Sequence, residues 1–339
     1  YKGNSIWGPF FSNTIPQFSD TVKRALCLPK DMNVVPGPDT TGFLHRLILS
    51  SNGPIYIVNG EFLSIDRACC DAEITGRSVK RVTDETLLTG EYDTPKPGVV
   101  IFSSVNSNTQ RGFSKKKLIR ILNQIPSETP IIIDITQDYG NRPVNWEHVL
   151  SGRRNVYLIG SHIKHGRSGE GVGFCIFPRS NDILSEPRYT GWTACVSGLT
   201  GGTTTQSGTP SYDEDFRFMG GTPANILNTE MAIQYWESVL DAGETISTMH
   251  SYCIRLQDVF LNQLHPEIKS KCLNQFDDLR SKTLVLSGSE MQQLHQYLTD
   301  LGYTCDIREG DKLRITFDIH HTFQDVIKLA SDINQGVKS

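Results

Sequence analysis

Short apolar runs alternate with amphipathic segments between residues 33 and 177, and this alternation is the feature that most restricts the fold. The runs are PIYIVNG (54–60), GVVIFSSV (98–105), IIIDI (131–135), NVYLIGS (155–161) and GVGFCIF (171–177). They have the character of strands buried in a parallel sheet, and intervening segments such as SKKKLIRILNQI (114–125) have helical spacing. The alternation predicts an α/β fold with a mainly parallel sheet and helices on both faces.

The C-terminal third has a different pattern. After Pro223 a long helical stretch, ANILNTEMAIQYWESVLDAGETISTMHSYCIRLQDVFLNQL, leads to a smaller segment. There, TLVLSG (283–288) and KLRITFD (312–318) are predicted strands, and EMQQLHQYLTDLG and FQDVIKLASDI are predicted helices. We expect a large α/β domain over 25–225. A small α+β domain would combine 1–24 with 226–339 and include the connecting long helix.

The composition argues against several classes of function. The chain has 339 residues, a formal net charge of -4 and 21% charged residues, as is ordinary for a soluble globular protein. This mild acidity gives no sign of nucleic-acid or membrane binding, and no apolar run reaches the roughly 18 residues of a membrane span. Eight scattered cysteines without a CxxC pair indicate reduced thiols in a cytoplasmic protein, and no metal site is expected.

A carboxylate stands at the end of the most apolar run. In IIIDITQDYGNRPVNW (131–146), three isoleucines lead directly into Asp134. A carboxylate at the mouth of a buried strand is costly to bury unpaired, so Asp134 needs a positively charged partner. Ligands of open α/β sheets bind at the carboxyl ends of the strands, where 104–108 and 161–164 are also expected.

The segment NVYLIGSHIKHGRSGEGVGF (155–174) indicates what the positively charged partner of Asp134 is. A predicted strand runs into Ser161, His162 and Lys164, followed by a glycine-rich turn. Hydroxyl groups, backbone N–H groups and a histidine suit a phosphate. Pyridoxal phosphate needs a lysine for an imine, a carboxylate for its pyridinium nitrogen and a phosphate cup. Alone, Lys164 is typical of a surface lysine and Asp134 of a helix cap; together, at strand ends, they favour this cofactor.

Several motifs resemble those of class V aminotransferases, which are fold-type I pyridoxal-phosphate enzymes, and are closest to kynureninase-like members. DITQDYGNRPV is similar to the D-x-x-Q-x-x-G-x-x-P signature, and SHIKHGRSGEGVGF to the lysine loop. RFMGGTPAN (217–225) resembles R-F-x-x-G-T-P-N. LRITFDIHHTFQDV (313–326) and GNSIWGP (3–9) resemble C-terminal and N-terminal motifs of kynureninase. The resemblance spans nearly the whole chain.

The resemblance implies roles for individual residues. Lys164 would bind the cofactor covalently and act as general base at the substrate's Cα. Arg314 would clamp the α-carboxylate of the substrate. The cofactor would be held by Thr40, Thr41, Phe62, Asp134, Gln137, Ser161, His162 and Thr222. In the family, the residue matching Thr222 reaches the phosphate of the partner subunit, so a homodimer is expected.

These observations predict a pyridoxal-phosphate-dependent enzyme that acts on a small amino acid through a carbanion at Cα. Aminotransferase or kynureninase-like lyase chemistry is favoured. Cysteine desulfurase or C–S lyase activity, amino-acid epimerisation and a non-catalytic binding module remain as alternatives. The segment GLTGGTTTQSGTPSYDED (198–215) is interpreted as a linker or an active-site lid. Nucleotide binding by GRSGEGVG is disfavoured because its glycines precede a strand and not a helix.

Overall fold

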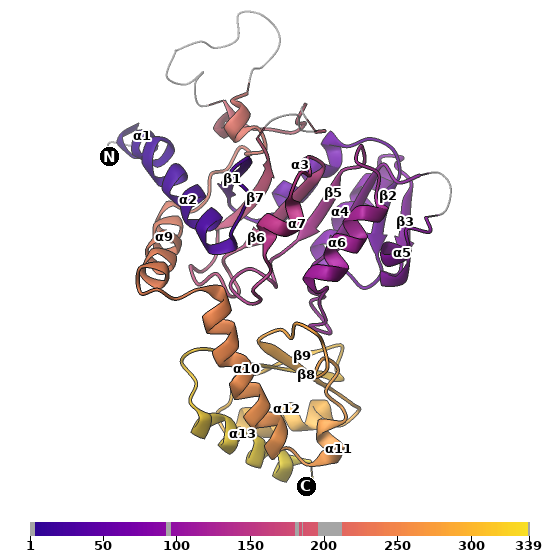
Figure 1. Ribbon diagram of the computed structural model, residues 1–339, viewed down its shortest axis with the longest axis vertical. Helices are drawn as coiled ribbons and strands as arrows, with labels where there is room; N and C mark the ends of the chain where they lie inside the picture. Colours follow the sequence, from indigo (N-terminus) through magenta and orange to yellow (C-terminus); the bar gives the residue numbers. More distant parts are fainter. Residues whose placement is uncertain (1–3, 93–95, 180–182, 185, 196–211, 338–339) are drawn as a thin grey trace, which may run out of the picture. The chain divides into compact units, whose positions relative to one another are not determined.

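The computed structural model describes residues 4–92, 96–179, 183–184, 186–195 and 212–337 (Figure 1). It divides into two compact units. The large unit consists of Tyr1–Ser104, Lys115–Tyr139 and Val144–Gly243, and the small unit of Val105–Ser114, Gly140–Pro143 and Glu244–Ser339. Residues 198–211 of the predicted lid lie outside the described residues.

A seven-stranded sheet with the order β1-β7-β6-β5-β4-β2-β3 forms the centre of the large unit, as far as this unit is described. Its strands are β1 (Met32–Gly37), β2 (Ile55–Val58), β3 (Val79–Val82), β4 (Val99–Ser103), β5 (Ile131–Asp134), β6 (Val156–Ser161) and β7 (Gly173–Pro178). Strand β7 runs antiparallel to both of its neighbours, and the strands from β6 to β3 are parallel. The carboxyl ends of the parallel strands therefore meet at one edge of the sheet.

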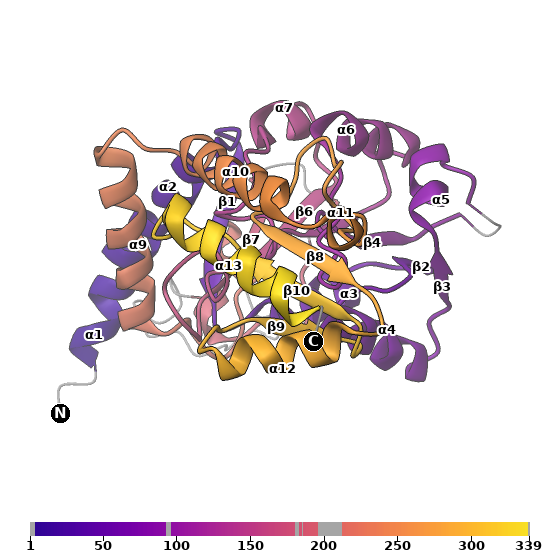
Figure 2. The same ribbon diagram turned by 90° about the horizontal axis from the view of Figure 1, so that it is seen from below.

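Helices cover both faces of this sheet. The helices of the large unit that follow β1 include α3 (Thr40–Ser50), α4 (Leu63–Ile74), α5 (Asp84–Thr89), α6 (Lys115–Gln124), α7 (Trp146–Leu150) and α9 (Ile226–Asp241). Figure 2 shows α3 and α4 on one side of the sheet and α6 and α7 on the other. Alternate strand residues such as Ile57, Ile101 and Ile159 share a buried cluster with α3 and α4. This arrangement confirms the predicted α/β fold.

The N-terminal segment belongs to the large unit. It forms α1 (Asn4–Pro9), the π-helical turn η1 (Phe10–Thr14) and α2 (Ile15–Leu26). Phe10 and Phe11 lie in the same buried cluster as α3 and α4, and α2 packs against β1 and α9. The described residues 4–24 therefore cluster with the large unit and not with the small domain predicted for 1–24, because aromatic side chains of this segment are buried there.

The long helical stretch predicted after Pro223 consists of two helices, α9 and α10 (Ile246–Gln263). Between them Gly243 adopts a left-handed conformation with φ 76°, and Thr245 caps α10 through a capping box with Thr248. Glycine tolerates this conformation at no steric cost, which ends α9 and lets the chain turn. The boundary between the two units follows Gly243.

The small unit has an α+β architecture, as predicted. Its elements after α10 are α11 (Pro266–Lys269), β8 (Thr283–Ser287), α12 (Met291–Asp300), β9 (Asp306–Arg308), β10 (Lys312–Thr316) and α13 (Phe323–Gly336). The three strands form an antiparallel sheet with the order β8-β10-β9. Figure 2 views this sheet from the side of α13, and residues of α10, α12, α13, β8 and β10 share one buried core.

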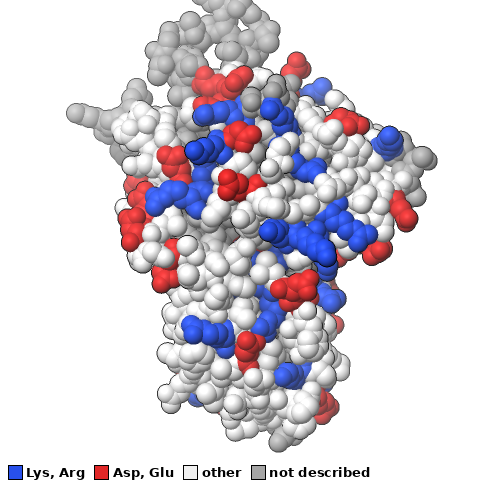
Figure 3. All heavy atoms as spheres, viewed as in Figure 1, with Lys and Arg blue, Asp and Glu red and all other residues white. Residues whose placement is uncertain are grey.

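Surface features agree with the composition. On the face shown in Figure 3, basic and acidic side chains are mixed and do not form one extended patch of a single sign. No helix in the described part of the chain has the length and apolar character to cross a membrane. The described residues also contain no group of three or more His, Cys, Asp or Glu side chains placed to hold a metal ion.

Candidate active site

Asp134 ends strand β5 at the carboxyl edge of the large sheet. Its neighbours in the adjacent strands are Ser103 on β4 and Ile159 on β6. One carboxylate oxygen accepts the backbone N–H of Thr136 at 2.7 Å. Burial raises the pKa of this carboxyl group, and no cationic side chain among the described residues offsets the effect. The site therefore suits a group that brings its own positive charge.

Glu61 provides a second carboxyl group beside Asp134. It lies three residues after β2, and its carboxylate accepts the backbone N–H of Ser103 at 2.6 Å as well as the Ser103 hydroxyl. Burial raises the pKa of Glu61 to about 7, and the negative charge of Asp134 contributes to the rise. Glu61 was not predicted from the sequence, although its place just after a buried strand is the same signal that identified Asp134.

The raised pKa of Glu61 predicts a pH-dependent stability that Glu61→Gln removes. The folded chain keeps this proton up to about pH 7, whereas the unfolded chain releases it near the ordinary pKa of 4.5. Between these values the folded state binds more protons, so the free energy of unfolding falls as pH rises, by up to about 3 kcal/mol. We expect Glu61→Gln to gain stability relative to the parent chain between pH 5 and pH 8.

The measurement is urea unfolding of both proteins, without cofactor, at each pH. His162 contributes the opposite slope because burial lowers its pKa to about 4, so the unfolded chain binds the extra proton there. The contribution of Glu61 is therefore obtained from the difference in free energy of unfolding between the parent chain and Glu61→Gln at each pH. If this difference in free energy of unfolding stays constant from pH 5 to pH 8, Glu61 does not have the raised pKa that burial is expected to give it.

The N-terminus of α3 lies at the same edge of the sheet. Gly37 at the end of β1 and Ser161 at the end of β6 pair with the same residue, Gly173, from its two sides. Thr40 and Thr41 form the first turn of α3 and are partly exposed. Free N–H groups at a helix N-terminus attract phosphate, so this turn suits the predicted phosphate contact.

The loop after β6 carries Lys164. The Ser161 hydroxyl donates to the Val172 carbonyl oxygen and accepts the N–H of Ile163, both at 3.3 Å, which fixes the start of the loop. The Lys164 side chain is exposed. The Ser168 hydroxyl is buried and has no hydrogen-bond partner among the described residues. The start of the loop is thus held by hydrogen bonds, and Lys164 lies exposed further along the loop, near the strand ends.

His162 is part of the core. Its ring is 1% exposed and lies 4.9 Å from the Tyr139 ring, 5.3 Å from Phe18 and 5.6 Å from Phe174, measured between centroids. Its Nδ1 lies 3.2 Å from the Gly166 carbonyl oxygen. With a pKa lowered to about 4 by burial, the ring is neutral at physiological pH. This position favours a role in shaping the lysine loop over the predicted contact with a cofactor.

Three further predicted residues lie on the surface of the large unit. Phe62, next to Glu61, precedes α4 and is 47% exposed. Gln137 is partly exposed in the turn after β5, and Thr222 is exposed in the loop before α9. Phe62 and Gln137 therefore belong to segments that begin at the same edge of the sheet as Asp134.

Arg314 belongs to the small unit, on β10. It forms an ion pair with Asp306 on β9 and donates to the Ser107 carbonyl oxygen at 2.7 Å. Its side chain is 12% exposed. Arg314, the predicted partner of a substrate carboxylate, is thus already paired with the Asp306 carboxylate. A substrate carboxylate would have to share the Arg314 guanidinium with Asp306.

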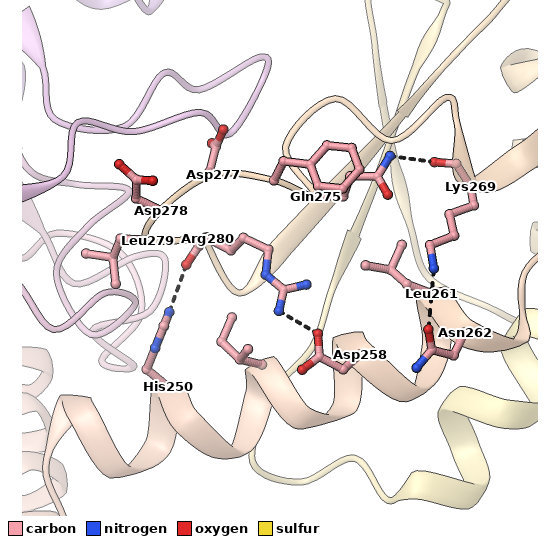
Figure 4. A pocket seen from close by; sticks show the side chains of 12 residues that line it. His250, Asp258, Leu261, Asn262, Lys269, Gln275, Asp277, Asp278, Leu279 and Arg280 are labelled. Carbon is pink, nitrogen blue, oxygen red and sulfur yellow. Dashed lines mark hydrogen bonds and ion pairs between the residues drawn. The ribbon is translucent and has the colours of Figure 1, made fainter.

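A separate pocket of about 600 Å³ lies in the small unit between α10 and the loop after α11 (Figure 4). Its polar groups contact one another. Arg280 pairs with Asp258 at 2.6 Å, and Nε2 of His250 lies 2.8 Å from the Arg280 carbonyl oxygen. None of the predicted site residues lines this pocket. Its lining does not define the chemistry of a ligand.

No protein-family model and no curated protein matches the chain. Solved structures match it over nearly its whole length. The cystine C–S lyase C-DES, in complex with its product cysteine persulfide, has 14% sequence identity and a TM-score of 0.74, covering 98% of this chain and 92% of that chain. Phosphoserine aminotransferase SerC from Cytophaga hutchinsonii has 14% identity and a TM-score of 0.67, with coverages of 96% and 88%. A cysteine desulfurase from Thermococcus onnurineus has 13% identity and a TM-score of 0.70, with coverages of 96% and 84%.

A mutant of C-DES, with glycine covalently linked to its pyridoxal-phosphate cofactor, matches with a TM-score of 0.75 and 15% identity. The chain has the fold of the fold-type I pyridoxal-phosphate enzymes. This confirms the fold predicted by the resemblance to class V aminotransferases. At such low identities the fold-type I likeness extends to the architecture alone, and the closeness to kynureninase stays a prediction.

Proposed function

We propose that the chain is a pyridoxal-phosphate-dependent enzyme that removes a proton or a substituent from the Cα of a small amino acid. The observation that carries the proposal is Asp134, a partly buried strand-end carboxyl group whose pKa is raised by burial and for which the described residues provide no cation. It lies at the edge where open α/β sheets bind their ligands. A pyridinium nitrogen would supply the missing positive charge.

The residues at this edge fit the cofactor. Thr40, Thr41 and the N–H groups of α3 would hold its phosphate, Asp134 its ring nitrogen and Lys164 its aldehyde carbon, while Phe62 would lie against the ring. Bound pyridoxal phosphate supplies an electron sink for a carbanion at the substrate's Cα. Asp134, once ionised, keeps the ring nitrogen protonated.

Side chains of the protein would then accept and return the proton of the substrate's Cα. The Lys164 amine accepts the Cα proton as general base, and it can return that proton to another carbon. Glu61 keeps its own proton near neutral pH, so the strand ends carry one negative charge and not two. The hydrogen bonds of Ser161 hold the base of the lysine loop in register with β7.

Cystine C–S lyase chemistry is the second candidate, supported by the fold likeness to C-DES. A desulfurase that stores sulfur on a cysteine needs an accessible thiolate. Cys305 and Cys195 are both partly exposed, but burial raises the pKa of each thiol and disfavours its thiolate. Neither of these two thiols is therefore favoured as a sulfur-storing nucleophile, which supports a lyase that releases its sulfur product directly.

The test is the near-visible absorption spectrum of the purified protein after incubation with pyridoxal phosphate and removal of the unbound cofactor by gel filtration, before and after borohydride. We expect a band that is lost on reduction. A screen of amino acids, including cystine, then separates transamination from C–S cleavage by the product formed: an amino-form cofactor in the first case, pyruvate and a persulfide in the second. A protein that is colourless after incubation with excess cofactor and removal of the unbound cofactor would overturn the enzyme assignment and favour a binding module.

We also propose that the chain forms a homodimer. Leu227 and Met231 are 71% and 54% exposed and lie four residues apart on α9, so they share one face of the helix. They follow Thr222, the residue predicted to reach a partner subunit. We expect light scattering to give a dimer mass and Leu227→Ser/Met231→Ser to shift it toward the monomer. A monomeric parent chain would contradict the proposal.

A further inference from the structure

The first turn of α3 is capped by a carboxylate from the chain itself. Asp39 is the N-cap residue, and its Oδ1 accepts the N–H of Gly42 at 2.6 Å. Under the proposed function, a cofactor phosphate held by Thr40 and Thr41 needs the same N–H groups. The Asp39 carboxylate and the phosphate are both anions, so they repel each other at this helix N-terminus. They also compete for the same few backbone N–H donors.

Arg46 lies one helical turn further along α3, and its guanidinium points back toward this N-terminus. The residue is only 8% exposed, and its Nε donates to the Phe218 carbonyl oxygen at 2.6 Å. The guanidinium carbon lies 4.9 Å from the centroid of the Phe43 ring, and among the described residues the two terminal nitrogens have no hydrogen-bond partner. A buried guanidinium with two unused donor groups is a strong potential partner for an anion.

Glycines keep the space around this guanidinium open. A Cβ added to Gly42 would lie 3.4 Å from both terminal nitrogens of Arg46 and 3.5 Å from Oδ1 of Asp39. A Cβ added to Gly220 would lie 2.6 Å from Nη1 of Arg46. Asp39 and Arg46 therefore face each other across the position that a larger side chain at Gly42 would fill, and no ion pair joins them in the structure.

We propose that Asp39 competes with the cofactor phosphate for the N-terminus of α3, and that Arg46 receives the Asp39 carboxylate when phosphate binds. This inference rests on the proposed function. Rotation of the Asp39 side chain past Gly42 exchanges its bond to the Gly42 N–H for an ion pair with Arg46. The released N–H groups then bind phosphate. The exchange weakens the binding of the phosphate but leaves the ring contacts unaffected.

Asp39→Ser tests the competition, because serine caps a helix about as well as aspartate but carries no charge. Each protein is titrated with pyridoxal phosphate and with pyridoxal, which lacks the phosphate. We expect Asp39→Ser to bind pyridoxal phosphate about tenfold more tightly, equal to about 1.4 kcal/mol, and to bind pyridoxal with unchanged affinity. Asp39→Asn, a second neutral cap, should behave in the same way.

Arg46→Met tests whether Arg46 forms an ion pair with the Asp39 carboxylate when phosphate binds. We expect it to weaken pyridoxal phosphate binding by about tenfold when Asp39 is present, and by clearly less in the Asp39→Ser background, since the two groups are coupled. Equal losses in both backgrounds would overturn the role of Arg46. Weaker pyridoxal phosphate binding by both Asp39 variants, or an equal change for pyridoxal, would overturn the competition.

Inorganic phosphate separates this inference from the proposed function. If no variant binds pyridoxal phosphate, the proposed function fails, but phosphate can still be added to each protein during thermal unfolding. A larger phosphate-dependent rise in Tm for Asp39→Ser than for the parent chain supports the competition at α3. Equal rises in both proteins overturn it.

Discussion

Lys164→Ala is expected to abolish the borohydride-sensitive absorption band and to lower turnover by at least about 10³-fold, within the range that loss of a positioned general base produces. Lys164 is the lysine of the loop that follows β6, and Ser161 anchors this loop through two hydrogen bonds. The residue is exposed and lies three positions after the end of β6. Losing it removes both the covalent attachment of the cofactor and the base for the Cα proton.

Two controls sharpen this result. Lys116→Ala removes an exposed lysine on α6 and should leave the spectrum and turnover unchanged. Lys164→Arg keeps the positive charge but cannot form an imine, so it should fail like Lys164→Ala. Full activity in Lys164→Ala, or an equal loss in Lys116→Ala, would show that Lys164 does not bind the cofactor.

Asp134→Asn is expected to change stability and function in opposite directions. The amide oxygen can still accept the Thr136 N–H, while the carboxyl group that is costly to ionise in this position is removed. Without cofactor at pH 8, we expect the free energy of unfolding to rise by about 1–3 kcal/mol. Turnover should fall by about 10²–10³-fold, because the ring nitrogen loses the negative charge that keeps it protonated.

The two effects are measured separately, by urea unfolding without cofactor and by turnover at saturating cofactor. Asp134→Ala serves as a comparison, since it loses the acceptor as well and should not gain the same stability. Lower stability of Asp134→Asn would indicate that Asp134 has a structural cation partner and would remove the main support for the proposed cofactor site.

Local sequence was sufficient to predict the central strands. The runs at 54–60, 98–105, 131–135 and 155–161 contain β2, β4, β5 and β6, and the run at 171–177 contains all of β7 except Pro178. Strand β3 was missed because it lies at the edge of the sheet, where its VKRV residues are half-exposed and need no apolar character. The break between α9 and α10 was also missed, although Gly243 and the cap at Thr245 mark it.

Part of the candidate site could also be read from local sequence. Asp134 is the last residue of β5 and Lys164 lies three residues after β6, and a parallel sheet brings the ends of such strands to one edge. The placement of Asp134 beside Ser103 follows from the sheet register. Periodicity alone does not give that register, because it depends on which strands pair.

The sequence by itself thus determined the α/β class and the strand-end positions of Asp134 and Lys164, because these features depend on residues that are close together in the chain. Tertiary structure decided the rest. Ser103 reaches Glu61 across 42 positions of sequence, and the ring of His162 is buried by Phe18 and Tyr139. Even within α3, burial by distant segments leaves the guanidinium of Arg46 facing Asp39. Protonation and pairing depend on how much water the fold excludes from each group, which no short stretch of sequence specifies.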